Sequence, residues 1–358
     1  MCPDADGEDD GDHPLTECGC DECGDGRSDH ENGANTVERS KDVVASLFLH
    51  GFEILRARRT LHTVPAVPQG SAAPPAKDDP KPMADIGPLL AQWPVDTVAA
   101  AVTTTTETVA VGGPLGWQTR IASVSKLFVA FACLIALEEG TLTLEEHAGP
   151  EGSTVRHLLS HASGLAFDKD RALARPGERR IYSNIGFEKL AEHLAMRAGM
   201  GFERYLAEAV VKPLGMSDTA LRGSPAEGIV STVTDLSRFG RELLAPTLVS
   251  GETIAYATRP HFPELEGVLP GIGSFDPNPW GLGFEIRDGK QPHWTGKTNS
   301  EGTFGHFGAA GTFLWVDPDA GLAAAALTNR TFDKWAMATW PGFSDQMLES
   351  HRQSAEKR

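Results

Sequence analysis

The sequence lacks the short motifs that mark several large classes of enzyme. There is no G-x-S-x-G, so the serine-bearing strand-to-helix turn of the α/β-hydrolases is excluded. There is also no H-E-x-x-H pair of zinc ligands, no Walker-type phosphate loop and no dinucleotide-binding fingerprint. We therefore expect neither a metal nor a cofactor.

Cysteines are few and unevenly placed. Five occur in 358 residues, and four of them (Cys2, Cys18, Cys20 and Cys23) lie in the first 23 positions. The C-x-C-x-x-C spacing of the last three fits no standard structural zinc site. We interpret these cysteines as part of an acidic tail, with a metal-binding or interaction arm as the alternative. The fifth, Cys133, lies in an apolar stretch and is expected to be a reduced core residue.

Long apolar runs are also scarce. The run at 43–55 is too short to cross a bilayer and contains His50 and Glu53. The first residues are acidic and polar, unlike the basic and apolar regions of a signal peptide. These features favour a soluble, cytoplasmic protein without a membrane partner.

Negative charge is concentrated at the start of the chain. The net charge is −17, and residues 1–33 hold twelve acidic residues against one arginine, which is −11 of that total. The rest of the chain is only mildly acidic and has no basic stripe, so a nucleic-acid partner is not expected.

Composition divides the chain into four parts. Residues 1–36 are rich in charge, Gly and Asp, and a disordered tail is expected. A short helix and a proline-rich linker are expected in residues 37–82. Residues 83–353 carry the regular patterns of a compact domain, and residues 354–358 form a short tail.

Within 83–353 the patterns predict an α+β fold. The β-rich runs in 95–113 and 311–330 each contain a turn, so two hairpins are expected. The order is helix, hairpin, helical block, hairpin, helix. This order predicts an antiparallel β-sheet flanked by N- and C-terminal helices, with an all-helical subdomain inserted. Helices are expected at 86–92, from Ser123 to Gly140, and at 153–161, 184–198, 202–211, 232–244 and 331–351.

The most informative motif is Ser123-Val124-Ser125-Lys126. Residues three apart on a helix are neighbours on one face, so Ser123 and Lys126 would stand side by side. Burial among apolar residues favours the neutral form of a lysine, and a neutral amine can activate a serine as a nucleophile. Ser125 is the alternative nucleophile, but its place next to Lys126 points it away from that face. Taken alone, S-x-x-K also fits a solvated pair on an ordinary helix.

Two further segments accompany this motif in a specific order. Tyr182-Ser183-Asn184 precedes an expected helix, and His306-Phe307-Gly308 precedes the second hairpin. A Ser-Gly-Leu segment, 158–165, lies between the lysine and the tyrosine. The ordered set resembles the serine β-lactamase and penicillin-binding-protein superfamily, and most closely its class C-like, esterase-like branch. The resemblance covers about residues 84–350.

The resemblance implies a role for each matching residue. Ser123 would be the acylated nucleophile, and Lys126 the acceptor of its proton. Tyr182 would share the proton with Lys126, since an adjacent ammonium favours a phenolate. Asn184 would orient the lysine and the substrate. The N–H groups of Ser123 and Ala309 would form the oxyanion hole.

The chain departs from the family in its third motif. His306, Phe307 and Gly308 stand where β-lactamases and DD-peptidases usually have Lys-Thr-Gly or Lys-Ser-Gly. A histidine is mostly neutral at pH 7, so it is a weaker anchor for a substrate carboxylate. We therefore expect a serine hydrolase of the carboxylesterase type that acts on a small-molecule ester or amide. The sequence sets no oligomeric state.

Two other functions stay open. One is a DD-carboxypeptidase or weak β-lactamase on the same fold. The other is a catalytically silent ligand-binding protein that kept the pocket. His161 lies outside the matching motifs, and we assign it a structural role near the site.

A shortened chain tests the domain boundary. Residues 1–82 contain no motif residue, so a chain that begins at Met83 is expected to fold. Its kcat/KM for a short-chain p-nitrophenyl ester should stay within about threefold of the full-length value. Loss of activity from a well-folded shortened chain would show that the boundary is wrong.

Overall fold

The computed structural model describes residues 83–356, so the predicted tail, linker and cysteine cluster lie outside the described residues. A seven-stranded sheet runs through the described part in the order β1-β3-β2-β12-β11-β10-β9. Its neighbours are antiparallel except for β1 and β3, which are parallel. The predicted antiparallel sheet is therefore confirmed. The strands are β1 Ala84–Asp85, β2 Val98–Thr103, β3 Thr108–Gly112, β9 Glu285–Ile286, β10 Phe304–Gly308, β11 Thr312–Asp317 and β12 Leu322–Thr328.

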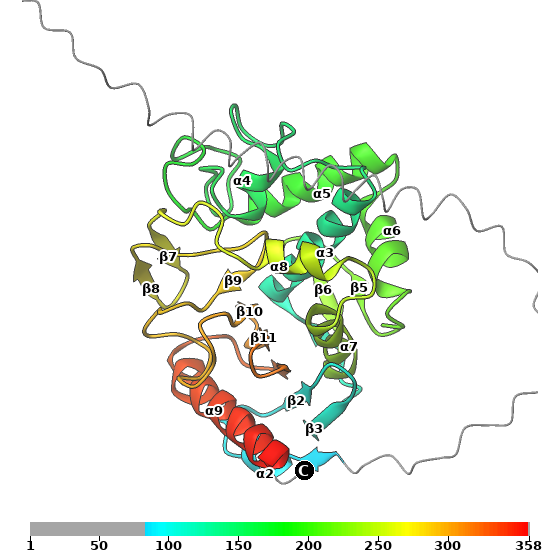
Figure 1. The fold of residues 1–358 in the computed structure, drawn as a ribbon, viewed down its shortest axis with the longest axis vertical. Coiled ribbons are helices and arrows are strands. Elements are labelled where there is room, and N and C mark those ends of the chain that lie inside the picture. Colours follow the sequence, from blue (N-terminus) through cyan, green and yellow to red (C-terminus); the bar gives the residue numbers. More distant parts are fainter. Residues whose placement is uncertain (1–82, 357–358) are drawn as a thin grey trace, which may run out of the picture. The chain divides into compact units, whose positions relative to one another are not determined.

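Pairing between the two predicted hairpins joins them into one sheet. β2 and β3 form the first hairpin, β11 and β12 the second, and β12 pairs with β2 across more than 200 residues of sequence. Figure 1 shows the cyan strands from the start of the described chain beside the orange strands near its end. β12 contains a run of alanines, Ala323 to Ala326, and all of the strand is buried. Small side chains on both faces allow helices to approach this central strand closely.

One face of the sheet is covered by the ends of the described chain. The long helix α9, Lys334–Glu356, packs there with the short helix α2, Gly87–Leu90, around buried aromatic rings such as Trp315 and Trp340. Figure 1 shows α9 and α2 at the same end of the view. These are the flanking helices that the sequence predicts.

The opposite face is covered by two helices of the inserted segment. They are α3, Ser125–Glu138, and α7, Val233–Leu244, and both belong to the larger apolar core. The rings of Phe128 and Phe239, one from each helix, stack at 4.2 Å between centroids. Residues 125–136 of α3 are all buried. A helix that is apolar on every side belongs in the interior, and α3 carries the predicted catalytic lysine there.

The inserted segment is predicted to be all-helical; in the structure it is mainly helical and also contains two small sheets. Its further helices are α4 Val155–Leu159, α5 Asn184–Ala198, α6 Phe202–Leu206 with the π-helical turn Ala207–Val211, and α8 Gly251–Ala257. The small sheets contain β4 Thr119–Arg120, β5 Ala220–Leu221 and β6 Ile229–Ser231, and then β7 Gly267–Leu269 and β8 Gly273–Phe275. No helix in residues 83–356 is long and apolar enough to cross a membrane.

Two predicted helix boundaries are wrong in ways that concern the site. Ser123 does not begin the helix, because Ala122–Val124 form a 3₁₀ turn, η1, ahead of α3. The helix expected at 153–161 covers only Val155–Leu159, with Thr154 at its N-cap position. His161 follows α4 in a left-handed conformation, with φ at 54°, and a helix cannot continue through that geometry.

Gly283 shows how closely the insertion packs on α3. Its φ is +86°, and a Cβ there would lie 2.2 Å from the Cβ of Ala130, one turn after Lys126. Gly321, with φ at +62°, has no atom within 4 Å of the same point. A substitution at Gly321 therefore tests backbone strain alone, whereas a substitution at Gly283 tests backbone strain together with a steric clash.

Gly321→Ala should lower the free energy of unfolding by about 1–2 kcal/mol, the cost of a left-handed alanine. Gly283→Ala should lower it by about 1–3 kcal/mol more, because it overpacks the core against α3. Urea unfolding of both variants measures the difference. Equal losses would mean that the α3 contact tolerates the extra methyl group.

Candidate active site

A tight backbone turn presents the predicted nucleophile. Ser123 is the middle residue of η1, and it is half-buried between Ala122 and Val124, which are buried. Ala122 has a φ of 47°, a left-handed conformation that is strained for alanine. Strain of this kind collects at functional sites and persists only where the surroundings enforce it.

Lys126 lies fully buried directly behind Ser123. Its Nζ is 3.3 Å from Ser123 Oγ, 2.6 Å from Asn184 Oδ1 and 3.0 Å from the main-chain oxygen of Ala226. The structure therefore brings together three of the predicted residues, Ser123, Lys126 and Asn184. The remaining contact, to Ala226, comes from the loop before β6.

The partners of Lys126 decide what a neutral amine can do. The oxygens of Asn184 and Ala226 can only accept hydrogen bonds, so each takes one N–H of the lysine. A neutral amine has two hydrogens and one lone pair. With both hydrogens engaged, the lone pair is left for the hydroxyl of Ser123. This is the arrangement that a general base requires.

Burial also favours the neutral form of Lys126. Desolvation lowers the pKa of Lys126 from 10.5 to about 7, while the charges of Glu227 and Glu188 act in the opposite direction. A buried amine without an adjacent carboxylate loses its proton more readily, because the charged form has no water around it. Near neutral pH, a large share of Lys126 is therefore neutral.

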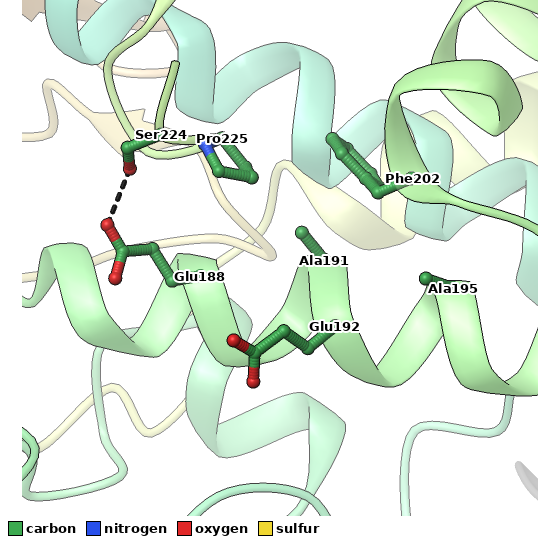
Figure 2. A pocket seen from close by; sticks show the side chains of 7 residues that line it. All are labelled: Glu188, Ala191, Glu192, Ala195, Phe202, Ser224 and Pro225. Atoms are coloured by element: carbon green, nitrogen blue, oxygen red, sulfur yellow. Dashed lines mark hydrogen bonds between the residues drawn. The ribbon is translucent and has the colours of Figure 1, made fainter.

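A loop next to α5 supports the contact between Lys126 and Ala226. Ser224 Oγ donates to Glu188 Oε1 at 2.6 Å and accepts from the N–H of Ala226 at 3.2 Å. Figure 2 looks into the cavity between this loop and α5 and shows the Ser224–Glu188 hydrogen bond. Glu188 thus contributes both charge and support to the lysine. The cavity is lined by Glu188, Ala191, Glu192, Ala195, Phe202, Ser224 and Pro225.

Tyr182 and His306 form a hydrogen-bonded pair whose direction can be deduced. His306 Nδ1 lies 2.6 Å from the carbonyl oxygen of Phe307, which only accepts, so Nδ1 carries the hydrogen. Neutral His306 then accepts at Nε2, where the Tyr182 hydroxyl lies 3.2 Å away. The phenol therefore donates to His306, and its oxygen lies within hydrogen-bond reach of Ser123.

Tyr182 and His306 are both uncharged near neutral pH. Burial lowers the pKa of His306 to about 3, and the charge of Lys126 acts in the same direction. Burial raises the pKa of Tyr182 above its ordinary value, against the lowering effect of its hydrogen bond with Ser123. Tyr182 thus holds its proton while Lys126 can lose its own. The phenolate that the sequence analysis expects is disfavoured in this structure.

A helix cap holds the second motif in place. Ser183 is the N-cap of α5, and its Oγ accepts the N–H of Gly186 at 3.0 Å. The N–H of Asn184 donates to the carbonyl oxygen of Phe167 at 2.8 Å. Tyr182 lies just before the cap and Asn184 just after it, so both side chains are fixed by the start of one helix.

The third motif is pressed against the nucleophile turn. A Cβ on Gly308 would lie 2.5 Å from the carbonyl oxygen of Ile121 and 3.0 Å from the Cβ of Ala122. Thr312 Oγ1 donates to the same Ile121 oxygen at 2.8 Å. Glycine is therefore required at 308, and the turn that includes Ala309 is held beside η1. This is where the predicted oxyanion hole would lie.

Ser125, the alternative nucleophile, makes a structural contact. It is buried, and its Oγ accepts the N–H of Ile229 at 3.1 Å. Cys133 is also buried, in accord with its predicted place in the core, and burial raises the pKa of its thiol to about 12. In residues 83–356, no cluster of three or more His, Cys, Asp or Glu side chains is placed to hold a metal ion.

Some of the site could not be found from residue types. Ala226 contributes only a carbonyl oxygen, for which no motif exists. Trp280 packs against Tyr182 and His306 at 5.9 and 5.8 Å between ring centroids. Its signal in the sequence is weak, a single tryptophan in a stretch rich in Gly and Pro.

Comparisons with known proteins identify the family of this chain. A family model described as Beta-lactamase matches residues 85–342. The chain belongs to this β-lactamase family, whose members with this fold are serine hydrolases. A solved structure described as a β-lactamase from Mycobacterium bovis is 52% identical, with a TM-score of 0.73, and the match covers 74% of this chain and 98% of that one.

More distant relatives have varied descriptions. A D-alanyl-D-alanine-carboxypeptidase/endopeptidase, AmpH, from Escherichia coli is 27% identical over 143 residues, 30% of this chain and 37% of that protein. The match thus spans little more than a third of this relative's length. Simvastatin synthase (LovD) from Aspergillus terreus, with 17% identity and a TM-score of 0.63 over 75% of this chain and 97% of that one, shares the fold.

The pH dependence of activity should follow Lys126. Since the neutral amine is the base, kcat/KM should rise with pH through about 7 and then level off. Glu188→Gln removes a charge that raises the lysine pKa and keeps an acceptor for Ser224, so the midpoint should move to lower pH. A pH–rate profile with p-nitrophenyl acetate measures it.

Glu192→Gln is the matched control, because Glu192 is exposed on the same helix and lines the same cavity. Its midpoint should stay close to that of the unchanged protein. A midpoint that moves to higher pH in Glu188→Gln would contradict the role given to Lys126.

Proposed function

We propose that this protein is a serine hydrolase that forms an acyl-enzyme on Ser123, with esters or amides without an essential carboxylate as substrates. Neutral Lys126 takes the Oγ proton as the oxygen attacks the carbonyl carbon. The N–H groups of Ser123 and Ala309 stabilise the resulting oxyanion, and removal of one such donor usually costs about 3–4 kcal/mol.

Proton return completes the first half-reaction. As the tetrahedral intermediate collapses, the leaving alcohol or amine takes the proton of Tyr182, and the Lys126 ammonium restores it. The proton of Ser123 has then reached the leaving group, and Lys126 is neutral again. Water attacks the ester carbon in the second half-reaction with the same residues in the same roles.

The observation that carries the proposal is the set of contacts around Lys126. Two carbonyl oxygens engage its hydrogens, and the third contact is Ser123 Oγ. A buried lysine kept only for structure is normally paired with a carboxylate. The arrangement also speaks against a catalytically silent binding protein, which would have no need of a lysine with a pKa near 7.

The third motif supports the substrate class. His306 is neutral, with a pKa of about 3, so it offers no positive charge to a substrate carboxylate. Phe307, with its aromatic side chain, adds no hydroxyl there. We infer that neutral esters bind better than penicillin-like or peptide-terminal carboxylates.

DD-peptidase or β-lactamase activity is the second candidate. It is favoured by the description of the Mycobacterium bovis structure as a β-lactamase and of AmpH as a carboxypeptidase. Hydrolysis of nitrocefin against p-nitrophenyl acetate separates the two candidates. Faster turnover of nitrocefin would favour the second.

The nucleophile can be tested directly. Ser123→Ala should abolish labelling by a fluorophosphonate probe and reduce ester hydrolysis to background, whereas Ser125→Ala should keep most of both. Intact mass and peptide mapping report the labelled residue. Labelling that survives Ser123→Ala would refute the assignment, and an adduct at Ser123 without turnover of any ester would indicate a binding protein.

A further inference from the structure

His161 contacts the catalytic tyrosine segment from two directions. Its carbonyl oxygen accepts the N–H of Ile181 at 2.9 Å, and its ring Nδ1 accepts the N–H of Ser183 at 3.1 Å. The main-chain groups on both sides of Tyr182 are therefore bound to one residue. Between them, the two imidazole and phenol rings pack at 4.4 Å between centroids.

The backbone of His161 has an uncommon, left-handed conformation. Its φ is 54°, in the left-handed region, which is uncommon for residues other than glycine although histidine adopts it more often than most. The residue is 1% exposed. In this conformation its carbonyl group and its side chain both accept hydrogen bonds from the segment before α5. A strained residue next to a catalytic group indicates a functional constraint.

The protonation state of the ring follows from its partner. A main-chain N–H only donates, so Nδ1 must be without hydrogen, and the hydrogen lies on Nε2. Nε2 is buried and has no hydrogen-bond partner within residues 83–356. Burial, with the charges of Lys126, His306 and Arg180, holds the pKa of His161 well below its usual range. The acceptor at Nδ1 is thus present throughout the working pH range.

We propose that His161 is a positioning residue, which fixes the Tyr182 hydroxyl between Ser123 and His306 through its Nδ1 acceptor and its left-handed backbone. This proposal rests on the proposed function, since it gives His161 a role in that reaction. His161 makes no hydrogen bond to Ser123 or Lys126. Substitution of His161 should therefore lower kcat, which includes the step in which Tyr182 moves a proton. It should change KM much less.

Three substitutions separate the acceptor from the backbone. His161→Asn keeps an acceptor one bond from Cγ, as Nδ1 is, and asparagine tolerates the left-handed conformation. His161→Leu has nearly the shape of asparagine without the acceptor. His161→Gly permits the backbone conformation and also lacks the acceptor. Melting curves confirm that each variant is folded at the assay temperature.

With p-nitrophenyl acetate, His161→Asn should keep kcat within about threefold, the span of a modest loss of transition-state stabilisation. His161→Leu and His161→Gly should lose at least about tenfold in kcat with KM changed less than threefold, because general acid catalysis contributes about 10²–10⁴-fold. If the leucine variant does not fold, the asparagine and glycine variants still give the comparison.

Two results would overturn the proposal. One is a folded glycine variant with unchanged kcat, which would show that the acceptor is not needed. The other is an asparagine variant as impaired as the leucine variant. Fluorophosphonate labelling of Ser123 is measured alongside, so that failure of the proposed function is recognised separately: it would appear as an unlabelled Ser123 in the unchanged protein.

Discussion

The burial of the Lys126 amine determines which groups can surround it. Lys126 lies inside an apolar helix, where a charged group is costly. Its partners are two neutral carbonyl oxygens and a serine, which satisfy the amine without stabilising its charge. Lys290 makes a useful contrast, because it is also buried but bonded to the carboxylate of Glu285. A carboxylate partner favours an ammonium, and an ammonium has no lone pair for Ser123.

The low polarity around Lys126 also determines the protonation states of Tyr182 and His306. A buried ammonium would stabilise a phenolate at Tyr182, but a lysine near its pKa does so only in part. The neutral His306 accepts the phenol's hydrogen and keeps the hydroxyl in place. Replacement of a lysine by a histidine in the third motif therefore has two effects. It leaves position 306 without a positive charge, and it supplies Tyr182 with an acceptor that a lysine ammonium could not provide.

The sequence predicted the sheet and its flanking helices, because both depend on local patterns. The β-rich runs in 95–113 and 311–330, each with a turn, are signals of this kind. The 3₁₀ turn at Ser123 was not predictable, since the strain at Ala122 is imposed by distant segments that press on it. The carbonyl of Ala226 was missed for a similar reason: main-chain groups carry no residue-type signal.

Close approach between distant segments explains how such strain persists. Gly308 lets β10 reach the carbonyl oxygen of Ile121, and Thr312 bonds to the same oxygen. Residues of the large sheet thereby fix the backbone just before Ser123. On the other side, His161 and the start of α5 fix Tyr182. The nucleophile and the tyrosine thus belong to separately packed elements, and their approach depends on contacts that only the complete fold supplies. A site built in this way gains its geometry from rigid packing on both sides, since a loop alone could not hold a left-handed alanine.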